Sequence, residues 1–133
     1  MRKNRLSKSR GFTLIELLIV ISIILILVGI AAGSYQRTIV RSRETVLKQD
    51  LVEMRKAIDN YTMDKQAAPQ SLDDLVPDYL HILPEDPITH AKDWVPKVES
   101  VVLSPDQTGS GITDVHSASD KVSPFEGTAY NTW

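Results

Sequence analysis

The sequence contains no cysteine among its 133 residues. Disulfide frameworks, iron–sulfur sites, thiol nucleophiles and lipid-modified cysteine anchors are therefore excluded. Proline is also absent from position 12 to position 68, so one helix can run through this stretch without interruption. Charged residues are absent from Leu17 to Tyr35, and no second apolar run of that length follows. These absences predict a single spanning helix and one small domain of about a hundred residues.

The charge-free run itself has the dimensions of a membrane span. Its nineteen positions, at about 1.5 Å per residue, reach roughly 28 Å, which is close to the thickness of a bilayer hydrocarbon core. Five basic residues and no acidic residue precede Gly11: Arg2, Lys3, Arg5, Lys8 and Arg10. The positive-inside rule places this basic head on the cytoplasmic side, with the remainder translocated or embedded.

The part of the chain after Gly11 has a net negative charge. A chain cut after Gly11 would keep ten basic and seventeen acidic residues. An acidic protein is a poor general binder of nucleic acid, so no nucleic-acid partner is expected.

A basic head followed by an apolar run has three possible fates. The first is a conventional secretory signal cleaved after small residues near Ala31, and the second is an uncleaved signal anchor. The third is cleavage before the apolar run, which leaves the hydrophobic helix on the mature protein. The residues just before the run distinguish these fates.

Residues Arg10 to Glu16 read RGFTLIE. This heptapeptide resembles the class III signal of type IV prepilins and of type II secretion pseudopilins. The resemblance implies that a membrane peptidase cuts between Gly11 and Phe12, that Phe12 is then methylated at its amino group, and that Glu16 is the family's assembly glutamate. The position of the heptapeptide directly before an apolar run is also typical of that family.

The free-energy cost of an acid inside a spanning helix also favours a paired, functional Glu16. An ionisable side chain there costs about 2.5 to 3.5 kcal/mol on insertion scales and is normally paired. In a bundle of staggered parallel helices, Glu16 can meet the positive amino terminus of Phe12 in a neighbouring subunit. The alternative is that Glu16 lies at headgroup level as a favourable acid near a helix N-terminus.

The helix is predicted to continue as an amphipathic segment. Apolar residues recur at spacings of three and four along one stripe: Leu47, Leu51, Met54, Ile58 and Tyr61. Opposite charges at helical spacing predict ion pairs on the solvated face, namely Glu44 with Lys48, Glu53 with Lys56, and Arg55 with Asp59. We therefore expect one helix of fifty-odd residues, apolar all round in its first half and striped in its second.

Beyond the helix the chain becomes rich in proline and turn residues. Pro69 ends the helix, and Ser71 with Asp74 has the spacing of a capping box. A longer set of residues resembles the G-type major pseudopilin: Tyr61, Asp64, Pro69, Leu72, Leu75, Tyr79, the segment LPEDP at 83–87, and Trp94. This resemblance extends the likeness to about residue 95.

The last third of the sequence favours strands. Short strands are predicted at 98–103, 112–117 and 129–133. The expected fold is α+β and pilin-like, with a long N-terminal helix against a small antiparallel sheet of about three strands. The expected divisions are a leader at 1–11, a transmembrane or filament-core helix at 12–35, the amphipathic half of that helix at 36–66, and a small globular head at 67–133.

A calcium ion is a further implication of the resemblance, because major pseudopilins hold calcium in the loop equivalent to residues 116–127. Calcium takes six to eight oxygen ligands. Suitable oxygen-bearing side chains in this loop are Ser117, Ser119, Asp120, Ser123 and Glu126. The alternative is a polar turn that binds no metal.

Enzymatic activity has no support in the sequence. His81, His90 and His116 have no ligand spacing, and neither a nucleophile motif nor a phosphate loop occurs. The resemblance implies a structural subunit, the major pseudopilin of a type II secretion system. The alternative within the class is a type IV pilin for adhesion, motility or DNA uptake, and a less favoured one is a secreted binding domain with a conventional signal.

The resemblance also implies partners and a location. The partners are other copies of the chain in a helical polymer, the prepilin peptidase, minor pseudopilins, an inner-membrane assembly platform, and membrane lipid before assembly. The location is the bacterial inner membrane, crossed once with the N-terminus cytoplasmic, and a periplasmic or extracellular filament after assembly.

Overall fold

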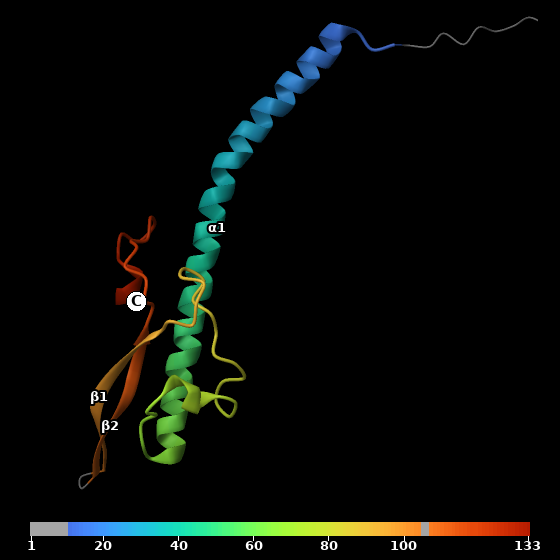
Figure 1. The fold of residues 1–133 in the computed structure, drawn as a ribbon. Coiled ribbons are helices and arrows are strands. Elements are labelled where there is room, and N and C mark those ends of the chain that lie inside the picture. Colours follow the sequence, from blue (N-terminus) through green and yellow to red (C-terminus); the bar gives the residue numbers. More distant parts are fainter. Residues whose placement is uncertain (1–10, 105–106) are drawn as a thin grey trace, which may run out of the picture. The chain divides into compact units, whose positions relative to one another are not determined.

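The computed structural model describes residues 11–104 and 107–133 (Figure 1). Its elements in chain order are α1 (Leu14–Lys65), the 3-10 turn η1 (Leu72–Leu75), β1 (Val95–Ser104), β2 (Gln107–His116) and the 3-10 turn η2 (Tyr130–Thr132). The chain divides into two compact units after Thr38. We call them the N-terminal unit, which ends at Thr38, and the head, Ile39–Trp133.

The N-terminal unit contains the apolar part of α1. Its fifteen large apolar side chains from Phe12 to Ile30 are all between 44% and 86% exposed. Full burial of such a side chain is worth about 1.5 to 3 kcal/mol, so a water-exposed helix of this kind is unfavourable. Within the described residues, α1 is the one helix long and apolar enough to cross a membrane. This unit therefore fits membrane anchoring or burial against other apolar helices.

The head has one hydrophobic core built on the striped part of α1. The predicted stripe is confirmed, since Leu47, Leu51, Met54 and Ile58 are at most 2% exposed and Tyr61 packs at the edge. The partners of this stripe come from every later part of the chain: Leu75, Trp94, Ile112, Val115 and Tyr130. The long helix packed against a small antiparallel sheet matches the predicted α+β fold.

The end of α1 is sharply defined. The helix spans 52 residues and ends at Lys65, and Gln66 follows with a φ of 51°. A residue in this left-handed conformation is a common helix terminator. Ser71 and Asp74 then form the predicted capping box at η1, in which the Ser71 side chain accepts from Asp73 and the Asp74 carboxylate accepts from the Ser71 backbone.

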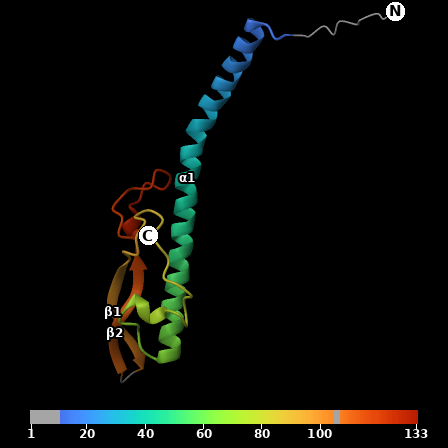
Figure 2. The same ribbon diagram turned by 45° about the vertical axis from the view of Figure 1, so that its right-hand side comes forward.

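The sheet is a two-stranded antiparallel hairpin of β1 and β2. Figures 1 and 2 both show it lying alongside the part of α1 that belongs to the head. The register shifts after Lys97, which pairs with Asp114, to Val98, which pairs with Ile112. Thr113 is therefore the extra residue of a β-bulge, a device that increases twist and bends the strand.

One glycine lets the hairpin approach the chain after α1 closely. A Cβ at Gly111 would lie 2.5 Å from the Ala68 Cβ and 2.9 Å from the Ala68 carbonyl oxygen. Next to this contact, the Ile112 amide donates to the Pro69 carbonyl oxygen at 2.8 Å. Glycine at 111 thus allows the segment after α1 to lie close enough to β2 for this hydrogen bond.

The predicted third strand at 129–133 is wrong. Tyr130–Thr132 forms η2, and only a single bridge joins Ala129 to Val122. The reason is that the rings of Tyr130 and Trp133 pack edge to face with their centroids 5.0 Å apart. The Tyr130 hydroxyl also donates a hydrogen bond to Glu44 of α1. A 3-10 turn allows this arrangement, whereas an extended strand would place alternate side chains on opposite faces.

Candidate functional site

The predicted cleavage position lies in exposed chain before α1. Gly11 and Phe12 are outside the helix, and Phe12 is 86% exposed. Among the described residues, apart from Gly11 and its chain neighbours, no atom lies within 4 Å of a Cβ built at Gly11. Exposed chain segments without secondary structure are where proteolysis occurs most readily, and Gly11 and Phe12 lie in such a segment.

Thr13 connects the exposed dipeptide to the helix. Its hydroxyl accepts a hydrogen bond from the Glu16 amide at 3.3 Å, and its carbonyl oxygen accepts from the amides of Glu16 and Leu17 at 3.1 and 3.2 Å. This is the arrangement of an N-cap residue, which satisfies amides that have no partner in the first turn. Thr13 therefore defines the start of α1.

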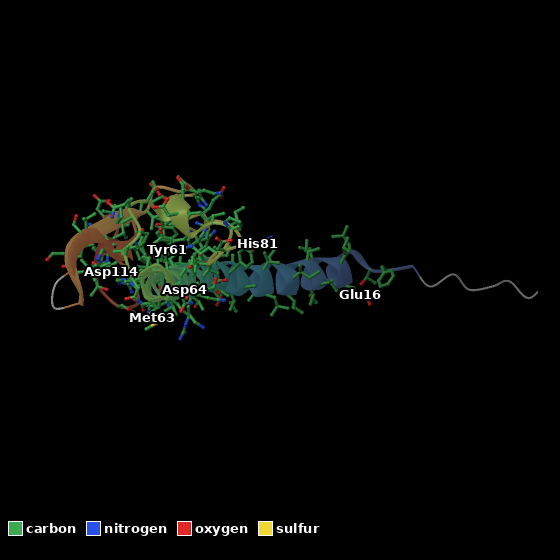
Figure 3. The ribbon with its side chains drawn as sticks, turned by 90° about the horizontal axis from the view of Figure 1, so that it is seen from below. Glu16, Tyr61, Met63, Asp64, His81 and Asp114 are labelled. Atoms are coloured by element: carbon green, nitrogen blue, oxygen red, sulfur yellow. The ribbon has the colours of Figure 1, made fainter. Side chains whose placement is uncertain are left out.

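Glu16 lies in the first turn of α1, close to the exposed dipeptide (Figure 3). An acid at this position is favourable because the helix dipole is positive at its N-terminus. No ion pair within residues 11–104 and 107–133 involves Glu16.

The five residues predicted to hold calcium are placed in different environments. Ser117, Ser119 and Ser123 are buried, whereas Asp120 and Glu126 are exposed. The Ser117 hydroxyl donates to the Asp86 carboxylate, and the Ser119 amide donates to the Ser117 hydroxyl.

Two more side chains of this loop are engaged within the protein. The Ser123 hydroxyl accepts from the amides of Phe125 and Glu126, and the Glu126 carboxylate pairs with Lys48. Ser117, Ser123 and Glu126 therefore already have partners within the protein in this arrangement. Calcium binding here stays a prediction, and it would require the loop to exchange some of these bonds.

The histidines show no catalytic arrangement in the part of the chain that the structure describes. His81 and His90 are exposed. The Nε2 of His116 lies 3.5 Å from the Asp114 carboxylate, and its Nδ1 lies 2.5 Å from the Trp133 main-chain oxygen. No group of three or more histidine or acidic side chains in the described part is placed to hold a metal ion.

Arg55 has a different ion-pair partner from the one that helical spacing predicted. The predicted pair with Asp59 is replaced by an ion pair with Asp114, whose Oδ1 lies 2.6 Å from the Arg55 Nε. The same guanidinium donates from Nη2 to the main-chain oxygens of Val115 and Trp133. One side chain of α1 thus bonds to β2 and to the last turn.

Two other acids have roles that their surroundings in the sequence do not show. Asp86, in the segment 83–87, is fully buried and accepts from the amides of Ile88 and Thr89 as well as from the Ser117 hydroxyl. Glu44, predicted to pair with Lys48, is buried and accepts from the Tyr130 hydroxyl at 2.8 Å. Lys48 pairs with Glu126 instead.

Comparison with known proteins gives the class of the N-terminal segment. Residues 6–32 match the family described as "Prokaryotic N-terminal methylation motif". The match includes Gly11, Phe12, Thr13 and Glu16. The chain therefore carries a prokaryotic N-terminal methylation motif.

Individual relatives are type IV fimbrial proteins. A "Type IV major fimbrial protein FimA" of Dichelobacter nodosus is 44% identical over 62 residues, which is 47% of this chain and 40% of that protein. A "Probable minor fimbrial protein" of the same organism is 42% identical over 59 residues, covering 44% of this chain and 37% of that protein. The matched region is thus less than half the length of each relative. No solved structure matches the chain.

Proposed function

We propose that the protein is a structural subunit of a type IV pilin-like filament. The observation that carries the proposal is the N-terminal unit, in which an exposed Gly11–Phe12 bond, a first-turn Glu16 and an exposed apolar helix follow one another. The family match of residues 6–32 supports it. In this proposal the prepilin peptidase cleaves after Gly11, and Phe12 becomes the methylated first residue.

The exposed apolar helix explains why such a subunit has two states. Before assembly, lipid covers the helix in the bacterial inner membrane, with the basic residues before Gly11 on the cytoplasmic side. After assembly, the same surface is covered by the helices of other subunits, which also bury apolar side chains. A filament core of these helices removes the exposure that the isolated chain shows.

Glu16 orients the assembly in this proposal. Its carboxylate pairs with the free amino group of Phe12 in a neighbouring subunit, a group that exists only after cleavage. Leaving one member of a desolvated charge pair without its partner is strongly destabilising, by about 3 to 5 kcal/mol. The pair therefore makes addition of a subunit dependent on its processing and on its axial position.

Two kinds of filament fit this subunit. The resemblance of Asp64, Pro69, Tyr79 and the segment 83–87 to the G-type major pseudopilin favours a type II secretion pseudopilus. The named fimbrial relatives favour a type IV pilus at least as well. A deletion strain distinguishes them: loss of protein export to the medium supports the pseudopilus, and loss of surface fimbriae with intact export supports the pilus.

The proposal is tested by the mature N-terminus and by Glu16→Gln. Mass spectrometry should find a methylated Phe12 as the first residue, whereas a start near Ala32 would indicate a conventional secretory signal and overturn the proposal. Glu16→Gln should be inserted into the membrane but abolish filaments in electron micrographs. Glu53→Gln is the matched control, since it makes the same change at an exposed position on the same helix. Normal filaments from Glu16→Gln would contradict the proposal.

A further inference from the structure

Thr13 separates two conformations of the chain within a single residue. On its N-terminal side, Gly11 and Phe12 are exposed and non-helical, and on its C-terminal side α1 begins at Leu14. Both Thr13 oxygens accept from the Glu16 amide, the hydroxyl at 3.3 Å and the carbonyl at 3.1 Å. The start of the helix therefore depends on a side-chain bond that only a few residue types can make.

The location of this start matters because the scissile bond lies two residues away. A peptide group inside a helix has its carbonyl oxygen and amide bonded along the helix, whereas hydrolysis requires the carbonyl to be accessible. In a membrane the backbone is under additional pressure to become helical, because unbonded amides are costly in lipid. Without a cap at Thr13, the helix can extend toward the cleavage position.

The residues upstream indicate where an extended helix would begin. Phe12 has no side-chain acceptor and is a poor N-cap, but glycine is an acceptable one. The next residue able to start the helix is therefore Gly11. A helix capped there would have Phe12 as its first residue, and the Gly11–Phe12 bond would become part of the helix terminus.

We propose that Thr13 is a positioning residue for processing: its hydroxyl cap stops α1 at Leu14 and keeps the Gly11–Phe12 bond in a cleavable, non-helical conformation. This rests on the proposed function, because it concerns the same peptidase. Thr13 acts on the conformation of the substrate and takes no part in the hydrolysis.

The capping chemistry predicts which substitutions are tolerated. Serine and asparagine provide an acceptor and are good N-caps, whereas alanine and valine provide none. Valine is the closest in shape to threonine, since it replaces the hydroxyl with a methyl group. Thr13→Ser and Thr13→Asn should therefore be processed like the original chain, and Thr13→Val and Thr13→Ala should be processed poorly.

The experiment uses the full chain in detergent micelles with purified prepilin peptidase. A substrate whose cleavable conformation is populated only in part has a higher apparent KM in proportion, while kcat stays the same. Thr13→Val and Thr13→Ala should raise KM by roughly 2- to 30-fold at unchanged kcat. NMR chemical shifts should show helical values at Phe12 in these two variants only, and Trp fluorescence should show an unchanged head.

Two results would contradict the role of the Thr13 cap, and a third would contradict the proposed function. An unchanged KM for Thr13→Val and Thr13→Ala overturns the role of the cap. A defect in Thr13→Asn equal to that in Thr13→Ala also overturns it, because the peptidase would then be recognising the side-chain shape. Failure of the original chain to be cleaved after Gly11 overturns the proposed function itself, which is distinguishable from the other two results.

Discussion

Tyr130 donates a hydrogen bond to the carboxylate of Glu44 at 2.8 Å, although the two residues are 86 positions apart. Both are buried, at 4% and 5% exposure. The bond joins η2 to the part of α1 that lies in the head. Since a buried carboxylate without a hydrogen-bond donor is costly, this contact both satisfies Glu44 and attaches the last turn to the helix.

Tyr130→Phe should destabilise the head. It removes the donor to Glu44 and leaves a buried acceptor unsatisfied, which costs about 1 to 3 kcal/mol. For a domain of this size, each kcal/mol lowers the melting temperature by about 4 to 8 °C. Trp fluorescence measures the effect in the full chain, because Trp94 and Trp133 both lie in the head.

A double substitution provides the control for this prediction. Tyr130→Phe combined with Glu44→Leu removes the donor and the buried acid together, and should recover most of the lost stability. A double variant no more stable than Tyr130→Phe alone would contradict the role given to the pair. Burial and the Glu44 carboxylate also raise the pKa of Tyr130 to about 12. Its contribution to stability is therefore complete below pH 10 and is lost as pH rises through about 12.

Gly111→Ala should destabilise the head through a steric clash. The new Cβ would meet the Ala68 Cβ at 2.5 Å, closer than carbon atoms can approach, so the hairpin or the segment after α1 must move. Overpacking of this kind costs about 1 to 3 kcal/mol. Adding Ala68→Gly should restore only part of the stability, because the Ala68 carbonyl oxygen would still lie 2.9 Å away. Unchanged denaturation of Gly111→Ala would show that the close approach is absent in solution.

Acid should weaken the contact between Arg55 and Asp114. Burial alone would raise the pKa of Asp114, but hydrogen bonds from Arg55 and from the Val115 amide, with the charges of Arg55 and His116, lower it below the ordinary 3.8. A lowered pKa gives stability that is present above pH 3.8 and is lost as pH falls through the folded-state value. Urea denaturation between neutral pH and strongly acidic pH measures this loss.

Asp114→Asn isolates this contribution from the other carboxyl groups. The pKa of Asp50 changes in the opposite direction, because burial and the nearby Glu53 and Asp86 raise it. The stability difference between the original chain and Asp114→Asn should therefore be constant near neutral pH and shrink below about pH 4. A difference that does not depend on pH would mean that the Asp114 charge contributes nothing.

Calcium in the loop at 116–127 is tested by the same unfolding assay. An ion that binds only the folded head at a hundred times its Kd stabilises it by about 2.7 kcal/mol. The melting temperature should then rise with calcium and fall again with a chelator, and Asp120→Asn with Glu126→Gln should remove the response. Identical melting with calcium and with chelator would rule out a calcium site in this loop.

Structural features that depend on residues close together in the sequence were predictable. The uninterrupted stretch before Pro69 predicted one helix of fifty-odd residues, and α1 has 52. The spacing of Ser71 and Asp74 predicted the capping box, and the three–four spacing from Leu47 to Tyr61 predicted the buried stripe. These features depend on residues within a few positions of one another, which is what spacing rules describe.

Features set by distant partners were not predictable in this way. Glu44 and Arg55 have opposite charges four positions away and were assigned to surface pairs, but they bond to Tyr130 and Asp114. Asp86, in the turn-rich segment 83–87, is buried and accepts a hydrogen bond from Ser117, 31 positions away. A surface pair on a helix is worth only about 0.2 to 0.5 kcal/mol, so a stronger bond to a distant part of the chain outcompetes it. Sequence spacing carries no information about such partners.

Every residue of the hydrophobic core cluster belongs to the head, and none belongs to the exposed apolar helix before it. The hydrophobic packing of the head therefore needs no side chain of the exposed apolar helix. If the proposed filament is correct, the surface of the head and the apolar helix can be altered separately, because a substitution in one leaves the packing of the other unchanged.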